Sequence, residues 1–285
     1  MKIFKKTLAV ILAAMFVVLC FAGCSKMQIA EKITDKTMLI AYTEECEPFI
    51  YTDENGELTG FDVEIFNKII DNVKNESKDY KFVQVEEGYK VGEDVAYTDE
   101  DGNDYIAYVM IGGIKKNTGS FNEDFTFTED IIDNRVITVT AKDSSITTYA
   151  DLQGVDAAVV TDNAVAALDK NSTIKNGLKS ATEYDDAAQA LNDLASGKVG
   201  AVVIDEFTFN VLENKDDFAV LGGELETISY VYSFKKLDWY VDAINEAIYE
   251  LKSSEYNDAD EFTPIVEKYF GYNASNFNYQ PSETK

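Results

Sequence analysis

Carboxylates are the residues of this sequence whose placement most readily suggests chemistry. Asp205 directly follows the apolar run 201–204, which has the character of a buried strand. Ligands of open α/β sheets bind in the crevice at the carboxyl ends of the strands, so Asp205 is a candidate ligand-binding group. The alternative is that Asp205 caps a helix running from Phe207 onward. Together with a second carboxylate such as Glu47, it could also act in acid–base catalysis, provided that one of the two pKa values is raised.

Other catalytic and metal-binding classes lack the residues that they need. The 285-residue sequence has no histidine and three cysteines, at positions 20, 24 and 46. Zinc sites and histidine-activated nucleophiles are therefore excluded, and we expect no metal and no cofactor. The acids at positions 99, 101 and 104 lack the spacing of a calcium-binding EF-hand loop. That segment is therefore interpreted as a solvated turn.

The charge balance limits the partners of the chain. It carries 52 acidic and 25 basic residues, a net charge of −27. Phosphate backbones are bound by basic surfaces, so we expect no nucleic-acid partner. Glu47 lies in an acidic loop, 44–47, which we interpret as solvated. If that loop instead borders a cleft, the cleft prefers cationic groups.

The N-terminus has the pattern of an export signal. Three lysines, at positions 2, 5 and 6, precede an apolar run over 8–21. The run is shorter than the roughly 20 residues of a membrane-spanning helix and ends in small residues, which predicts a signal over 1–23 that is removed. The sequence Phe-Ala-Gly-Cys at 21–24 resembles a bacterial lipobox, which implies lipid attachment at Cys24 and an extracytoplasmic, membrane-anchored protein. The alternative is an ordinary secretory signal containing a chance cysteine.

Strands and helices alternate along the remaining chain. Apolar residues recur every four positions from Phe61 to Val73, which predicts an amphipathic helix. An Asn-Gly turn at 55–56 predicts a hairpin over 50–58, and a similar turn at 97–102 predicts a second one. The pattern predicts further strands over 38–42, 81–85, 105–111, 135–141, 155–161, 199–205 and 227–234, and helices over 163–168, 185–196, 241–251 and 262–269. This alternation indicates an α/β fold.

Several motifs, in the same order, resemble one known family. They are Pro48-Phe49, Gly-Phe-Asp-Val at 60–63, Gly112-Gly113, Phe-Thr-Glu at 127–129, the segment 149–154, the segment 197–205 and Lys-Tyr-Phe-Gly at 268–271. Together they resemble family-3 extracellular solute-binding proteins, the amino-acid-type receptors of ABC importers, over residues 38–271.

The resemblance implies a type II periplasmic-binding-protein fold, with two α/β lobes joined by two crossing strands near 131–137 and 228–233. Lobe 1 would comprise 38–132 with 231–271, and lobe 2 would comprise 133–230. Residues 24–37 would form a tether and 272–285 a loose tail. A monomer of this kind would close about its hinge on a solute and deliver it to an ABC permease.

The resemblance also assigns candidate ligand-binding residues. Asp205 would take the ammonium group of the ligand, Gly113 belongs to the glycine turn, and Phe49 would either offer its ring to the ligand or pack internally. Asp162 and Asn163 occupy the helix start that receives a carboxylate in the family, where Asp162 would repel the carboxylate or cap the helix.

The sequence departs from the family where a carboxylate-binding arginine is usual, near Ser120. Arg135 is the single arginine, so Lys115 or Lys116 would have to supply a point charge instead. Cys46 stands where a stacking aromatic is usual, beside Glu47. The segment 86–104 replaces a short helix of the family with a hairpin.

We therefore expect a lipoprotein that binds a small polar, amine-bearing solute for an ABC importer and is not an enzyme. The alternatives are a sensor or partner-binding surface lipoprotein, and a carboxylate-based enzyme on the same fold.

Overall fold

The computed structural model describes residues 33, 37–72, 79–86, 95–107, 109–116, 125–235, 238–253 and 261–271. The predicted signal over 1–23, Cys24 and the predicted tail over 272–285 lie outside these residues, as does nearly all of the predicted tether. Among the described helices, none is long and apolar enough to span a membrane.

The first sheet is built from both ends of the described chain. Its strand order is β4-β1-β7-β15-β8. β1 is parallel to β4 and β7, and β15 is antiparallel to β7 and β8. The bounds are Thr37–Tyr42 for β1, Asp79–Gln84 for β4, Val109–Met110 for β7, Phe125–Phe127 for β8 and Ser233–Lys235 for β15. Strands from distant parts of the sequence therefore share one sheet.

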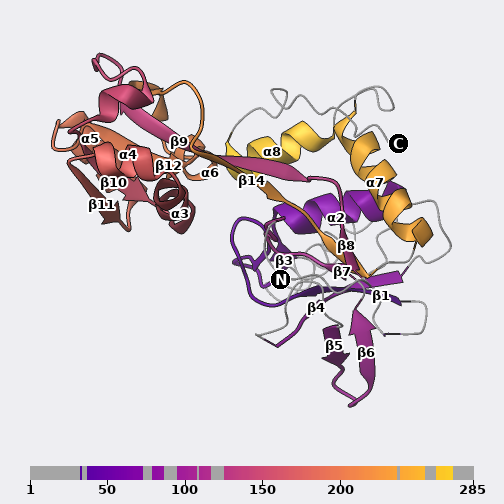
Figure 1. Ribbon diagram of the computed structural model, residues 1–285. Coiled ribbons are helices and arrows are strands. Elements are labelled where there is room, and N and C mark those ends of the chain that lie inside the picture. The colour runs from indigo at the N-terminus through magenta and orange to yellow at the C-terminus, as the bar shows by residue number, and fades with distance from the viewer. Residues whose placement is uncertain are drawn as a thin grey trace, which may run out of the picture.

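Three helices cover one face of this sheet: α2 (Phe61–Asn72), α7 (Asp238–Lys252) and α8 (Phe262–Phe270) (Figure 1). The predicted periodicity of α2 is confirmed, because Phe61, Ile65 and Ile69 are all buried; Val73 lies outside the described residues. These side chains pack with Ile244, Ile248 and Val266 from α7 and α8 in one core. The apolar faces of the three helices thus complete the hydrophobic core of this half of the molecule.

The second sheet has the order β11-β10-β12-β9-β13, and β14 also pairs with β9. The bounds are Ile132–Ala141 for β9, Asp156–Val160 for β10, Ser180–Tyr184 for β11, Ala201–Asp205 for β12, Phe218–Val220 for β13 and Glu226–Tyr230 for β14. The helices here are α3 (Asp162–Lys170), α4 (Ser172–Gly177), α5 (Ala187–Ala195) and α6 (Glu206–Asn210), with 3₁₀ turns at Tyr149–Leu152 and Lys215–Asp217. β10 and β12 are parallel, and each is followed by a helix, as the alternating sequence pattern predicts.

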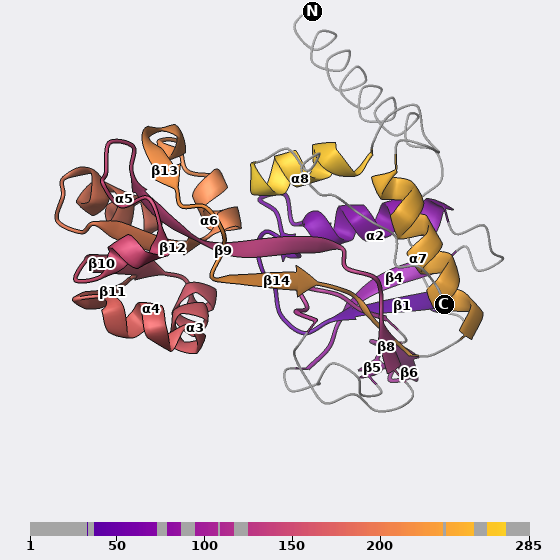
Figure 2. The same ribbon diagram turned by 45° about the horizontal axis from the view of Figure 1, so that its top comes forward.

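Two long antiparallel segments connect the two sheets. The first half of β9 pairs with β14, from Ile132 opposite Tyr230 to Val136 opposite Glu226. The second half of β9 pairs with β12 and β13 in the second sheet. Figure 2 shows β9 and β14 running side by side between the two α/β halves. The predicted pair of crossing strands is confirmed, while the lobe boundaries at 132–133 and 230–231 stay a prediction.

Some predicted elements differ from the structure. The single strand expected over 227–234 is divided into β14 and β15, because the chain changes partners at Val231 and Tyr232. Val231 N–H donates to the Ile114 carbonyl (2.9 Å), and Tyr232 N–H donates to the Thr128 hydroxyl (3.0 Å). The strand expected over 105–111 likewise changes partner: β6 (Asp104–Ala107) pairs with residues 95–98, and β7 pairs with β1 and β15. Position 108 lies outside the described residues. Periodicity alone cannot show such changes of partner.

Both predicted hairpin turns are confirmed, while residues 87–94 of the hairpin expected over 86–104 lie outside the described residues. β2 (Tyr51–Thr52) pairs with β3 (Leu58–Thr59), and β5 (Val95–Thr98) pairs with β6. In the second turn, Asp99 Oδ1 accepts hydrogen bonds from Asp101 N–H (3.0 Å) and Asn103 N–H (2.9 Å). The Asp99 carboxylate therefore binds backbone N–H groups within its own turn. Among the described residues, no group of three or more acidic or cysteine side chains is placed to hold a metal ion.

Candidate functional site

Asp205 ends β12, and α6 begins directly after it. Its side chain is buried, and the residue is only 5 % exposed. It occupies the N-cap position of α6, but its side chain accepts no capping hydrogen bond, so the alternative role as a helix cap is not seen. Oδ2 accepts a hydrogen bond from Asn163 Nδ2 (3.1 Å). Oδ1 is buried and, among the described residues, has no hydrogen-bond partner.

Burial is the largest influence on the pKa of Asp205. Loss of solvent raises the pKa of this carboxyl, and the nearby polar side chains of Thr161 and Asn163, together with the charge of Lys115, act in the opposite direction. A buried oxygen without a donor is costly. Asp205 Oδ1 can therefore accept a hydrogen bond from an N–H or O–H group of a ligand that enters the site.

The start of α3 supplies the partners of Asp205. Thr161 is the N-cap, and its hydroxyl accepts from Ala164 N–H (3.3 Å). The alternative that Asp162 caps the helix is wrong, since Asp162 is the exposed first residue of α3 and the neighbouring Thr161 is the N-cap. Thr161 has φ of 83°, the one described non-glycine residue in the left-handed region. Such a conformation is unfavourable for a β-branched residue and is found where surrounding contacts hold it.

Lys115, which belongs to the other half of the molecule, approaches the start of α3. Its ammonium group donates to Asn163 Oδ1 (2.5 Å), so Asn163 connects Lys115 with Asp205. The backbone around Lys115 is tied to β14, through a bridge to Tyr230 and through Lys116 N–H, which donates to the Ser229 carbonyl (2.9 Å). Three of the predicted residues, Lys115, Asn163 and Asp205, are thus brought together.

The glycine turn before Lys115 is held by Asp62. The backbone N–H groups of Gly112 and Gly113 both donate to Asp62 Oδ2, at 2.9 and 2.8 Å. Gly113 has φ of 63°, and a Cβ there would lie 2.9 Å from the Phe49 ring. Gly113 therefore permits a close approach of that ring, and the structure gives it a positioning role.

Phe49 packs inside the molecule. It is 5 % exposed, and its ring centroid lies 4.6 Å from that of Tyr230. Further rings around it belong to Phe61, Phe207 and Phe270. Of the two interpretations of Phe49, internal packing is the one that the structure displays. Glu47 is exposed, unlike the buried Asp205, so the two do not share one environment.

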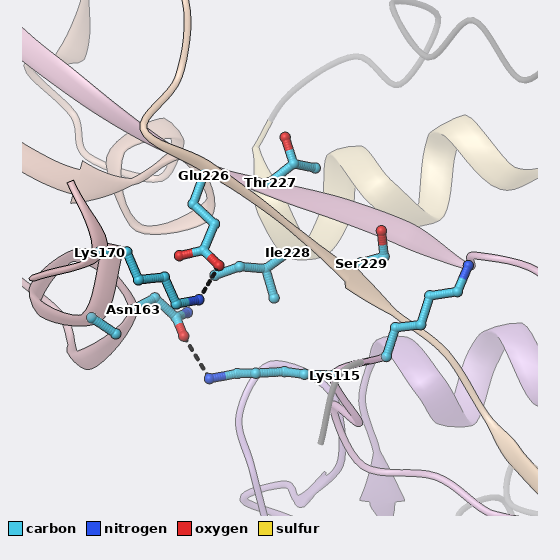
Figure 3. Close-up of a pocket in the computed structure, with 9 residues that line it drawn as sticks. Lys115, Asn163, Lys170, Glu226, Thr227, Ile228 and Ser229 are labelled. Atoms are coloured by element: carbon cyan, nitrogen blue, oxygen red, sulfur yellow. Dashed lines mark hydrogen bonds and ion pairs between the residues drawn. The ribbon is translucent and has the colours of Figure 1, made fainter. Parts of the chain in front are cut away.

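A hollow of about 200 Å³ lies beside this group of residues. It is lined by Lys115, Lys116, Asn163, Ala166, Lys170 and the segment 226–229 of β14. Figure 3 shows Lys115 reaching toward Asn163, and Lys170 paired with Glu226, around the same space. The hollow is thus bordered by the crossing strand β14, by α3 and by the loop that follows β7.

Sequence reasoning missed several contributors to the site. Thr161 was overlooked in favour of its neighbours, although a threonine before a helix is a recognisable cap. Tyr230 is buried, and burial, with a smaller contribution from the charge of Asp205, raises its pKa to about 12. Only its place in a crossing strand could have suggested it. Ser120, where the family arginine is expected, lies outside the described residues, and Arg135 pairs with Glu206.

A comparison of the sequence with known protein families agrees with the two-halved α/β fold described above. The model of the bacterial extracellular solute-binding proteins, family 3, matches residues 38–272. The chain belongs to this family. It is therefore a solute-binding protein, and the family resemblance noted from its motifs is confirmed. No curated protein sequence matches the chain.

Solved structures share the fold. A polar amino acid ABC uptake transporter substrate-binding protein from Streptococcus thermophilus is 21 % identical, with a TM-score of 0.59 over 84 % of this chain and 87 % of that one. The L-cystine solute receptor of Neisseria gonorrhoeae, in its unliganded open conformation, is also 21 % identical, with a TM-score of 0.59 over 83 % and 93 %. The second substrate-binding domain of a putative amino acid ABC transporter from Streptococcus pneumoniae is 18 % identical, with a TM-score of 0.56 over 82 % and 99 %. The type II periplasmic-binding-protein fold is thereby confirmed.

Proposed function

We propose that this solute-binding protein captures an amino acid by its ammonium group and delivers it to an ABC importer. The observation that carries the proposal is the buried Asp205 Oδ1, which has no donor among the residues that the structure describes, at the carboxyl end of β12. An ammonium group offers three N–H donors and a positive charge, which is what a buried carboxylate requires. The neighbours from Streptococcus thermophilus and Streptococcus pneumoniae, both described as amino acid transporter components, support the same ligand class.

The ligand carboxylate would meet Lys115. This ammonium group lies one hydrogen bond from Asn163, which in turn donates to Asp205. A zwitterion could thus place its two charges on Asp205 and Lys115, with Asn163 between them. Lysine provides a point charge without the fork geometry of arginine, so we expect looser selection of the carboxylate orientation than an arginine would give.

Capture would proceed by closure about β9 and β14, without chemical change to the ligand. Asp205 and Asn163 belong to the half of the molecule that contains β12 and α3, whereas Lys115 follows β7 in the other half. A ligand held by both halves would favour the closed arrangement, which a permease can recognise. We further propose a monomer anchored by lipid at Cys24 after removal of residues 1–23.

A thermal-shift screen tests this function. The mature chain would be heated with each of the twenty L-amino acids, with polyamines and with short peptides. A ligand at about 100 times its Kd stabilises the folded protein by roughly 2.7 kcal/mol. We expect a clear rise in Tm with at least one amino acid, and no rise with any of the compounds would contradict the proposal.

A further inference from the structure

The hollow adjoins the proposed amino acid site at Asn163. Asn163 belongs to both, because it lines the hollow and donates to Asp205 Oδ2. Pockets for drug-sized ligands measure about 300–1,000 Å³. A hollow of about 200 Å³ therefore has room for one end of a small ligand whose ammonium group is held by Asp205.

The lining of the hollow is rich in charge. Its polar lining includes Lys115, Lys170, Glu226, and the threonine and serine of β14 at positions 227 and 229. Lys116 also lines the hollow, but its ammonium group pairs with Asp130 (2.6 Å). Among the described residues that line the hollow, only Ala166 and Ile228 contribute apolar side chains. An apolar ligand side chain would remove water from these polar groups without replacing its hydrogen bonds, which is unfavourable.

Both residues of one ion pair line the hollow. Lys170, the last residue of α3, pairs with Glu226, the first residue of β14 (Figure 3). Ala167 of α3 and Ile228 of β14 pack in one apolar cluster, so the two elements are fixed relative to each other. The pair therefore lies within one half of the molecule, and its geometry does not depend on closure about the hinge.

A ligand end with a single charge would suit only one member of this pair. A carboxylate alone would approach Glu226, and an ammonium alone would approach Lys170. An end that carries both charges can place its carboxylate on Lys170 and its ammonium on Glu226. We propose that the hollow is a side-chain subsite that selects amino acids whose side chain ends in a second ammonium–carboxylate head. This inference rests on the proposed function.

Three matched ligands test the subsite by isothermal titration calorimetry. 2,6-Diaminopimelate has two heads, L-lysine lacks its distal carboxylate, and 2-aminopimelate lacks its distal ammonium. Hydrogen bonds between charged groups contribute roughly 1.5–3 kcal/mol, so we expect diaminopimelate, as the L,L or meso isomer, to bind about tenfold or more tightly than either analogue. This comparison needs only the unaltered protein.

Substitutions then locate the effect. Lys170→Met and Glu226→Gln should reduce the advantage of diaminopimelate, while Lys175→Met, which removes an exposed lysine paired with Asp169, should leave it unchanged. Circular dichroism would establish that each variant is folded. Equal binding of the three ligands, or an advantage that survives both substitutions, would overturn the subsite and leave the proposed function intact. Failure of every amino acid to bind would overturn both.

Discussion

Asp62 is buried beneath the glycine turn that leads to Lys115. Its carboxylate accepts hydrogen bonds from Gly112 N–H, Gly113 N–H and the Tyr232 hydroxyl. Burial raises its pKa to about 6, although these three hydrogen bonds act in the opposite direction. Asp62 thus joins a residue of α2 to the loop that carries Lys115 and to the segment between β14 and β15.

We predict that Asp62 makes the unfolding free energy depend on pH. Its pKa is higher in the folded chain than the value of 3.8 expected when unfolded, so the folded state binds the proton more tightly. This stabilisation is complete below about pH 4 and is lost as the pH rises through about 6, a change of about 3 kcal/mol. In Asp62→Asn the amide oxygen can still accept from both glycines, and this pH dependence should disappear.

Urea denaturation at pH 4, 5, 6 and 7 measures this effect. Other carboxylates, such as Asp53 and Asp156, have lowered pKa values and change stability in the opposite direction. The informative quantity is therefore the difference between wild type and Asp62→Asn at each pH. A difference that stays constant from pH 4 to pH 6 would contradict the prediction.

The residues of the site were predictable to the extent that they follow local patterns. Asp205 was recognisable because a polar residue ends an apolar strand, and Asn163 because it lies in the first turn of a predicted helix. Their connection through Lys115 was not predictable, since Lys115 and Asn163 are 48 positions apart and meet only through tertiary structure. Tyr230 was missed for the same reason.

At the scale of elements, α6 and α8 form a contact between the two halves of the molecule in addition to the crossing strands. The rings of Phe207 in α6 and Phe270 in α8 are stacked, with centroids 4.0 Å apart. Lys215 Nζ donates to the carbonyl of Asn210 (2.5 Å) and to that of Gly271 (3.0 Å). Because Asp205 directly precedes α6, this contact adjoins the proposed ligand site.

We predict that Phe207 and Phe270 are energetically coupled. Each change to alanine should destabilise the protein by about 3–5 kcal/mol, since both rings are buried. In a double-mutant cycle measured by urea denaturation, the two substitutions should deviate from additivity by about 0.5–1.5 kcal/mol. Phe66→Ala serves as the control, because Phe66 contacts Phe82 and Tyr232 instead. Strict additivity of Phe207→Ala with Phe270→Ala would contradict the coupling.

Elements with strong periodicity were predicted well, and weakly patterned ones were not. The helix from Phe61 and the strand ending at Asp205 follow directly from apolar spacing. β11 and α4 escaped prediction, because β11 contains no buried residue and α4 lacks a buried face. An edge strand gains its structure from pairing with β10 and not from its own composition.

At the scale of the whole molecule, the alternation of strands and helices was enough to predict an α/β fold. The arrangement of two halves joined by β9 and β14 came from the family resemblance. Periodicity could not reveal it, since β15 is separated in sequence from its partners β7 and β8 by the entire second sheet. The same long-range pairing places Lys115 opposite α3, so the site is a product of the complete topology.

The central claim is that Asp205 recognises the ammonium group of an amino acid. The most direct test is calorimetric titration of the ligand found by screening, beside its α-hydroxy acid analogue, into wild type and Asp205→Asn. Asp169→Asn, an exposed acid in an ion pair with Lys175, is the matched control. We predict that wild type and the control bind the amino acid at least tenfold more tightly than the hydroxy acid, and that Asp205→Asn loses this preference. An unchanged preference in a folded Asp205→Asn protein would contradict the account.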